Sequence, residues 1–146
     1  VRLIVPRQRI GVALVTFNAE GEVLLLRHVF HPTYPWGLPG GWLGRDEAPA
    51  DGLRRELREE LGRESELGPP ALISHEGPPH HIVMAYLGRL RPGEMRLNNE
   101  ILEAQWFAPG NLPRPSLPFT ERAVAAGLAL ARGEAVAALA WEGQPA

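Results

Sequence analysis

The sequence predicts an α+β fold in which a mixed β-sheet lies between α-helices. Short apolar, β-branched segments stand on both sides of an amphipathic helical segment, and a second helical segment follows further along the chain. The 15 prolines and 16 glycines are scattered as turn residues and form no linker. We therefore expect one domain over residues 1–146, a length at which about 70 % of the unfolded surface is buried on folding.

The first strands are expected to form a β-hairpin. The segment 9–17 is apolar and β-branched, 18–21 carries turn residues, and 22–28 reads as the hairpin partner. The segment 31–41, rich in Pro, Gly and aromatic residues, indicates a loop with one short strand. Three further strands are expected at 71–77, 81–90 and 101–108, with a Pro-Pro turn between the first two.

Two helices have recognisable ends. The first is expected from Ala48 to Leu61, with a proline in its first turn and Gly62 as its C-terminal cap. The second is expected at 119–131, where Thr120 has the character of an N-cap residue and apolar residues recur at helical spacing. A shorter helix is expected to follow, to Trp141.

The composition limits the classes of partner. The net charge of −2 gives no electrostatic reason to bind duplex nucleic acid or an anionic membrane. There is no cysteine for disulfides or thiolate metal sites, and no apolar run approaches the roughly 18 residues of a membrane helix. All 15 basic residues are arginine, so any phosphate-binding cation would be a guanidinium. A cytoplasmic protein is the simplest expectation.

The helix at 48–61 carries an unusual charge pattern. At about 100° per residue, its apolar residues form one stripe, and Glu56, Glu59 and Glu60 share an adjoining arc. Like charges at this spacing destabilise a helix slightly. A divalent cation such as Mg²⁺, which takes oxygen ligands, would reverse that cost. The alternative is a solvated helix face in which neighbouring arginines pair with the glutamates.

The spacing around this helix favours the metal interpretation. Gly41 is followed after five residues by Glu47, after seven more by Arg55-Glu56-Leu57, then by Glu59-Glu60 and by Gly62. This segment, 41–63, resembles the signature of the Nudix (MutT-like) hydrolases, G-x5-E-x7-R-E-U-x-E-E-x-G-U, in which U is apolar. Every acidic, basic and glycine position is filled. The sequence departs from it at Arg63, which stands where the pattern has an apolar residue.

The resemblance implies the Nudix fold and a Mg²⁺-dependent pyrophosphohydrolase, with Mn²⁺ as another candidate ion. It implies that Glu56 and Glu60 are the main metal ligands, that Glu59 shares the metals, and that the backbone carbonyl of Gly40 adds a ligand. It further implies that Glu47 supports the site. Arg55 would then orient the glutamates without binding substrate.

The general base is left open between three residues. Glu100 and Glu103 lie in a stretch where related enzymes often carry a further glutamate, and Glu59 is the third candidate. Glu100 is preferred because it precedes a predicted strand and can move toward a water molecule. Glu103 has the stronger case for being an ordinary exposed glutamate.

The loop at 27–36 offers substrate contacts. Arg27 could contact a phosphate, and Phe30 and Tyr34 could stack on a nucleobase, a contact worth about 1–3 kcal/mol per base. Trp36 is better explained by core packing. His80 and His81 would point to opposite faces of a strand, which makes them a poor metal pair and favours structural or rim positions.

The resemblance implies a small substrate, a nucleoside diphosphate derivative. Pro79, sixteen residues after Arg63, weakly favours ADP-ribose or a nucleotide sugar, because a proline near that distance is associated with ADP-ribose hydrolysis in this family. The alternatives are sanitising hydrolysis of nucleoside triphosphates, pyrophosphate removal from RNA 5′ ends, and a non-catalytic nucleotide sensor. A homodimer is compatible with each of them.

Overall fold

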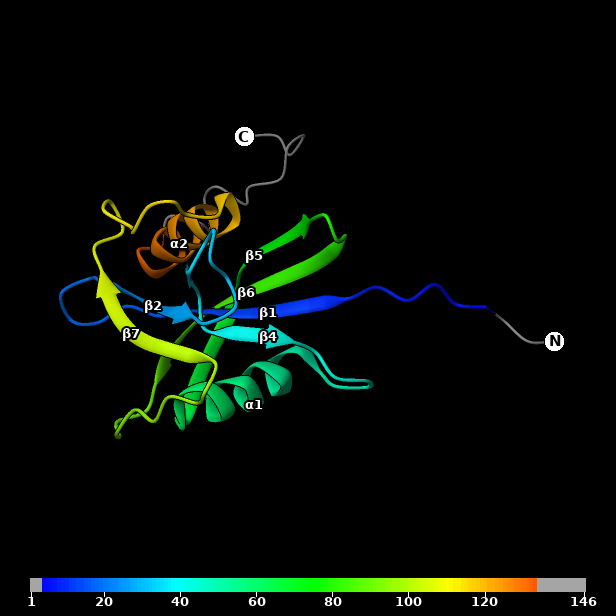
Figure 1. Cartoon of the computed structure of the whole chain (residues 1–146), viewed down its shortest axis with the longest axis horizontal. Coiled ribbons are helices and arrows are strands. Elements are labelled where there is room, and N and C mark those ends of the chain that lie inside the picture. The colour runs from blue at the N-terminus through cyan, green and yellow to red at the C-terminus, as the bar shows by residue number, and fades with distance from the viewer. Residues whose placement is uncertain (1–3, 134–146) are drawn as a thin grey trace.

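The computed structural model describes residues 4–133 and shows an α+β fold (Figure 1). Its elements are β1 (Ile10–Val15), β2 (Val23–His28), β3 (Trp36–Gly37), β4 (Gly40–Trp42), α1 (Pro49–Leu61), β5 (Ser65–Glu76), β6 (His81–Leu90), β7 (Ile101–Phe107) and α2 (Pro118–Ala131). A four-stranded mixed sheet has the order β4-β1-β6-β5, in which only the β1–β6 pair is parallel. A three-stranded antiparallel sheet has the order β3-β2-β7.

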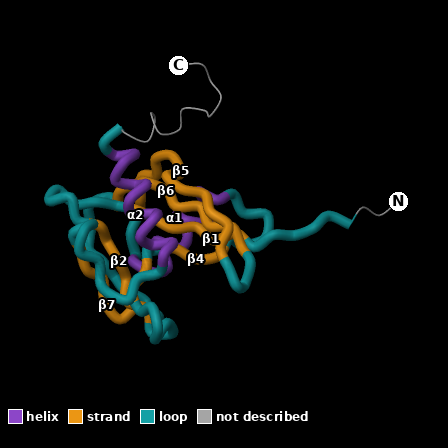
Figure 2. Tube along the Cα trace, turned by 90° about the horizontal axis from the view of Figure 1, so that it is seen from above, coloured by secondary structure: helices purple, strands orange, loops and turns teal. Residues whose placement is uncertain are grey.

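The two helices cover opposite faces of this strand assembly, with α2 above and α1 below the strands in Figure 1; seen from above in Figure 2, they overlap. Side chains alternate between the faces along β1 and β2, because successive residues of a strand point to opposite sides. On β1, Val12 and Leu14 join the buried cluster under α1, whereas Ala13 and Val15 join the cluster that contains α2 residues. The expected sheet between helices is therefore confirmed.

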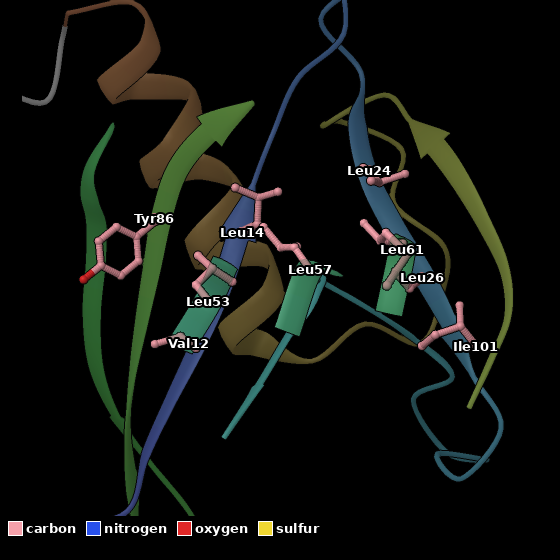
Figure 3. Close-up of a cluster of buried hydrophobic side chains, with 9 residues drawn as sticks. All are labelled: Val12, Leu14, Leu24, Leu26, Leu53, Leu57, Leu61, Tyr86 and Ile101. Atoms are coloured by element: carbon pink, nitrogen blue, oxygen red, sulfur yellow. The ribbon is translucent and has the colours of Figure 1, made fainter. Parts of the chain in front are cut away.

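Helix α1 is fixed by its ends and by its apolar stripe. Pro49 occupies the first turn, and Gly62 caps the C-terminus in the left-handed region at φ 63°. Leu53, Leu57 and Leu61 are fully buried against strand residues (Figure 3). Truncating one of these leucines to alanine would cost about 2–5 kcal/mol. The helix expected from Ala48 to Leu61 thus forms from Pro49 to Leu61.

The expected hairpin of the first two strands is wrong. β1 and β2 share only one isolated bridge, Phe17↔Val23, and then separate into different sheets. Asn18 still forms the turn, since its side-chain oxygen accepts hydrogen bonds from the backbone N–H groups of Glu20 and Glu22. Each is a central strand of its own sheet: β1 pairs with β4 and β6, and β2 pairs with β3 and β7.

Three other expectations need adjustment. β5 begins at Ser65, six residues before the expected strand, and pairs with β6 through irregularities around Pro70. Helix α2 begins at Pro118 with Leu117 as its N-cap residue, so the capping role expected of Thr120 is wrong. The loop at 31–41 contains two short strands, β3 and β4, instead of one.

The helix expected to reach Trp141 lies outside the described residues. None of the described helices has the length and apolar character to span a membrane.

Candidate active site

Two glutamates of α1 lie directly against the glycines of β4. The Glu60 Oε1 accepts a hydrogen bond of 2.8 Å from the backbone N–H of Gly40. Gly40 has φ +151°, and a β-carbon there would lie 2.0 Å from the Val12 carbonyl oxygen. A β-carbon on Gly41 would lie 2.5 Å from the Glu56 carboxylate carbon. Glycine is therefore required at 40 by the close approach of β4 to β1, and at 41 by the close approach of the Glu56 carboxylate.

Arg55 joins the remaining carboxylates. Its Nε and Nη2 donate to the two carboxylate oxygens of Glu47, at 2.8 and 2.9 Å. Its Nη1 donates to Glu56 at 3.1 Å and to Glu59 at 3.2 Å, and Nη2 also donates to the Trp42 carbonyl oxygen. The guanidinium holds the pKa of Glu47 down to about 2, and the glutamates raise the pKa of Arg55. Charge-assisted bidentate pairs of this kind fix geometry.

Glu56 and Glu60 are costly to keep ionised, because both are partly or fully removed from water. Glu60 is only 6 % exposed, and burial raises its pKa to about 8, with smaller contributions from the charges of Glu56, Glu100 and Glu59. Burial also raises the pKa of Glu56, although Arg55 opposes the shift. A desolvated, crowded carboxylate group favours protons or a bound cation.

The donor set fits a hard divalent cation such as Mg²⁺ or Mn²⁺, because it consists of oxygen atoms. Within residues 4–133, no group of three His, Cys, Asp or Glu side chains is arranged to bind one metal ion. Two contacts account for this: Arg55 engages Glu56 and Glu59, and the Gly40 N–H engages Glu60. Rotation of the carboxylates away from these donors would be required for joint ligation.

Glu100 is held beside this cluster by the loop that precedes β7. The backbone N–H of Asn98 donates to the Glu60 carbonyl oxygen at 3.2 Å, and that of Arg96 donates to Leu61 at 2.8 Å. The Asn98 side chain in turn accepts from the Glu100 N–H at 3.0 Å. The end of α1 is thereby tied to the loop, and the Glu100 charge contributes to the raised pKa of Glu60.

Glu103 and Arg27 form an ion pair with each other. They are cross-strand neighbours on β7 and β2, and the Arg27 Nε lies 2.8 Å from the Glu103 Oε1. Arg27, the predicted phosphate contact, is thus paired with Glu103, one of the three candidates for the general base. Arg27 is not among the residues that line the aromatic cavity described next.

An aromatic cavity of about 460 Å³ opens next to the two β4 glycines. Phe30 and Tyr34 line it, as the sequence analysis proposed for substrate contacts. Trp36 lines it as well while packing edge-on against Phe107, at 5.0 Å between ring centroids. Four further lining residues, Trp42, His28, His31 and Phe119, were not proposed from the sequence. The two histidines lie in the loop at 27–36 and Trp42 directly follows the paired glycines, whereas Phe119 had no local signal.

The histidines of the β5–β6 turn do not form a pair with each other. His81 lines the cavity and packs edge-on against Trp42, at 4.9 Å between ring centroids, whereas His80 stacks on His75 at 5.2 Å. The rim or structural positions expected for His80 and His81 agree with this arrangement.

Glycines 40 and 41 form the boundary between the aromatic cavity and the carboxylates. Both line the cavity, and both touch a glutamate of α1. No side chain of these two residues stands between the two regions. A ligand in the cavity can therefore approach the carboxylates along bare backbone.

Comparison with known proteins gives consistent matches. The model of the NUDIX domain family matches residues 7–128. A MutT-like protein from Streptomyces ambofaciens is 28 % identical over 104 residues, which cover 71 % of this chain and 66 % of the relative. An RNA pyrophosphohydrolase from Acidiphilium cryptum (strain JF-5) is 33 % identical over 108 residues, 70 % of this chain and 58 % of the relative. The chain thus matches less than two thirds of the length of either relative.

Among solved structures, the MutT NUDIX hydrolase from Burkholderia pseudomallei superimposes with a TM-score of 0.73 and 26 % sequence identity. The match covers 83 % of this chain and 98 % of that one.

Proposed function

The chain belongs to the Nudix hydrolase family, and from this premise we propose that it is a Mg²⁺-dependent pyrophosphohydrolase of nucleoside diphosphate derivatives. The observation that supports this best is the contact of Glu60 and Glu56 with the glycines that line the aromatic cavity. A diphosphate next to those glycines would lie within reach of the carboxylate group.

We assign metal ligation to Glu56, Glu60 and the Gly40 carbonyl oxygen, with Glu59 sharing the metals. A bound Mg²⁺ would neutralise the diphosphate and lower the pKa of an attacking water. Glu47 and Arg55 are positioning residues, because their bidentate pair holds the guanidinium against Glu56 and Glu59. Mn²⁺ is the second candidate ion, since it accepts the same oxygen donors.

We assign the general base to Glu100. It is exposed, lies close enough to Glu60 to raise that residue's pKa, and has no ion-pair partner within the described chain. Glu103 is the weaker candidate because Arg27 neutralises it. Glu59 is the remaining alternative, and its carboxylate would have to leave Arg55 to accept a proton.

ADP-ribose and nucleotide sugars are the substrates we favour. The aromatic cavity can stack a nucleobase on Phe30 or Tyr34, which contributes about 1–3 kcal/mol per base. Pro79 lies in the turn between β5 and β6, next to the cavity residue His81. The competing function is hydrolysis of oxidised or normal nucleoside triphosphates. RNA 5′ ends are a further candidate, because the Acidiphilium relative is an RNA pyrophosphohydrolase.

A substrate panel tests the proposal. The protein would be incubated with Mg²⁺ and ADP-ribose, nucleotide sugars, dinucleoside polyphosphates or nucleoside triphosphates, and products identified by mass spectrometry. AMP with ribose 5-phosphate is the expected result. Pyrophosphate released from a triphosphate would establish the competing function instead. The absence of product with both Mg²⁺ and Mn²⁺ would contradict the proposal and indicate a substrate outside the panel or a binding role.

A further inference from the structure

A second cavity, of about 730 Å³, lies on the other side of Trp42. It is bounded by the segment that leads into β1 and by the loop between β4 and α1, which run beside each other in Figure 1. Its lining residues with charged side chains are Arg7, Arg9, Arg45, Asp46 and Glu47. We call this cavity the arginine cleft.

The arginine cleft carries excess positive charge. Eight other arginines of the described chain form ion pairs with carboxylates, but within residues 4–133 none of Arg7, Arg9 and Arg45 does. Of the two acidic residues in the cleft, Glu47 is already neutralised by Arg55. Three guanidinium groups therefore face a single uncompensated carboxylate, that of Asp46. Such a site favours an anion with several oxygen acceptors.

Trp42 connects the arginine cleft to the aromatic cavity, because it lines both. Its ring, nearly half exposed, lies under the Arg9 guanidinium at 5.8 Å and against His81 at 4.9 Å. The strand residues before it, Gly40 and Gly41, touch the glutamates of α1. A ligand that extends from the aromatic cavity past these glycines thus meets the arginine cleft beyond Trp42.

We propose that the arginine cleft binds a second anionic group of the substrate, a phosphate or carboxylate remote from the diphosphate bond that is cut. This inference rests on the proposed function, because it takes the diphosphate to lie at the β4 glycines. Among nucleoside diphosphate derivatives, it predicts that those with a charged far end are hydrolysed with a higher kcat/KM than neutral-ended ones such as ADP-ribose. Neutral-ended nucleotide sugars would fill the aromatic cavity but leave the three arginines without a partner.

Matched substrate pairs test the cleft. UDP-glucose and UDP-glucuronate differ only by a carboxylate on the sugar, and NADH and NADPH differ only by one phosphate. We expect kcat/KM to favour the more anionic member of at least one pair by about tenfold, the value of one charge-assisted hydrogen bond. The triple variant Arg7→Gln, Arg9→Gln, Arg45→Gln should reduce this preference to about twofold or less, and leave the neutral-ended member unaffected.

The control variant removes the same charge elsewhere. Arg89→Gln, Arg91→Gln, Arg132→Gln changes three exposed arginines that line neither cavity described above, and it should keep the full preference. Equal loss in the two triple variants would show a net-charge effect and overturn the assignment. The absence of any preference in both substrate pairs would overturn it as well.

A binding measurement separates this inference from the proposed function. Isothermal titration in the presence of a chelator, which prevents hydrolysis, would compare UDP-glucose with UDP-glucuronate. If no substrate is hydrolysed but UDP-glucuronate binds about tenfold tighter only when the three arginines are present, the proposed activity fails and the anion site stands. If hydrolysis occurs and neither kinetics nor titration depends on the three arginines, the anion site fails alone.

Discussion

Helices α1 and α2 cover opposite faces of the same strands, yet their buried sides differ in chemistry. Helix α2 buries Thr120, Ala123, Val124 and Gly127, none of them charged. Helix α1 buries an apolar stripe and, beside it, the carboxylate of Glu60. The difference comes from what each helix meets. The α1 carboxylates reach the backbone of two glycines on the edge strand β4, whereas α2 packs on β1, β5 and β6.

This contrast shows how a packing helix can also hold reactive groups. Burying an unpaired charge on the α2 side would be costly, because the residues buried there are uncharged. On the α1 side, the Gly40 N–H and Arg55 satisfy the carboxylates while the cavity beyond the glycines gives access.

Glu60→Gln should have the largest effect. Loss of the charged ligand should lower kcat by roughly 10²-fold or more, because it removes charge stabilisation at the diphosphate. Unfolding free energy should stay the same or rise, since glutamine removes a carboxyl whose raised pKa makes its burial costly at neutral pH. Steady-state kinetics with Mg²⁺ and denaturant unfolding with a chelator would measure the two effects. Glu121→Gln, on the exposed first turn of α2, is the control, and near-normal kcat in Glu60→Gln would refute the metal assignment.

Arg55→Lys should lower kcat by about 10- to 100-fold, the usual range for residues that orient metal ligands. Lysine keeps the charge but cannot hold both oxygens of Glu47 while contacting Glu56 and Glu59. The apparent Mg²⁺ affinity should fall with kcat, which a purely structural role would not require. Arg58→Lys is the matched control, because Arg58 lies on the same helix and pairs only with the exposed Glu64. Equal effects in both variants would contradict the positioning role.

Glu56, Glu59, Glu60 and Arg55 could be proposed from the sequence because they share one helix and because the segment 41–63, which also includes Glu47, resembles the Nudix signature. Helical periodicity places residues three and four apart on one side, and Pro49 and Gly62 mark the ends of that helix locally. The apolar, β-branched run at 9–17 and the turn residues after it likewise indicated strands. These signals are all local in the sequence.

The features that the sequence did not reveal depend on pairing between distant segments. The Arg27–Glu103 ion pair needs the register of β2 with β7, and the aromatic cavity combines Trp42 with Phe119 from the other end of the chain. The first two strands diverge because the pairing of β1 with β6 and of β2 with β7 outweighs a local hairpin. Thr120 failed as a cap because Pro118 starts the helix earlier.

A glycine in each helix extends the comparison to stability. Alanine normally favours a helix by about 1 kcal/mol over glycine. Here an added β-carbon at Gly127 would lie 2.5 Å from the side chain of buried Val15, and one at Gly52 would lie 2.2 Å from Leu43 and 2.8 Å from Glu47. Both glycines thus allow their helix to approach its neighbour.

The two alanine variants should separate packing from function. Gly127→Ala should lower unfolding free energy by about 1–3 kcal/mol with unchanged kcat, because a fully buried β-branched side chain cannot yield. Gly52→Ala should cost less stability, since the Leu43 side chain is more exposed, but it should lower kcat by disturbing Glu47 and its contact with Arg55. Denaturant unfolding and kinetics on both variants would test this. A stabilised Gly52→Ala protein with full activity would contradict it.

The smallest expected effect is on the pH dependence of stability and concerns His28, the last residue of β2, which lines the aromatic cavity. Burial, and secondarily the charge of His31, lowers its pKa below the usual 6.5. The fold therefore favours neutral His28, and its contribution to stability is present above pH 6.5 and is lost as pH falls through the lowered folded-state pKa. In His28→Asn, the loss of unfolding free energy between pH 7.5 and pH 5 should be smaller than in the wild type. An NMR titration would give the pKa directly. A value at or above 6.5 would contradict the burial argument and would mean that the cavity is wetter than its aromatic lining indicates.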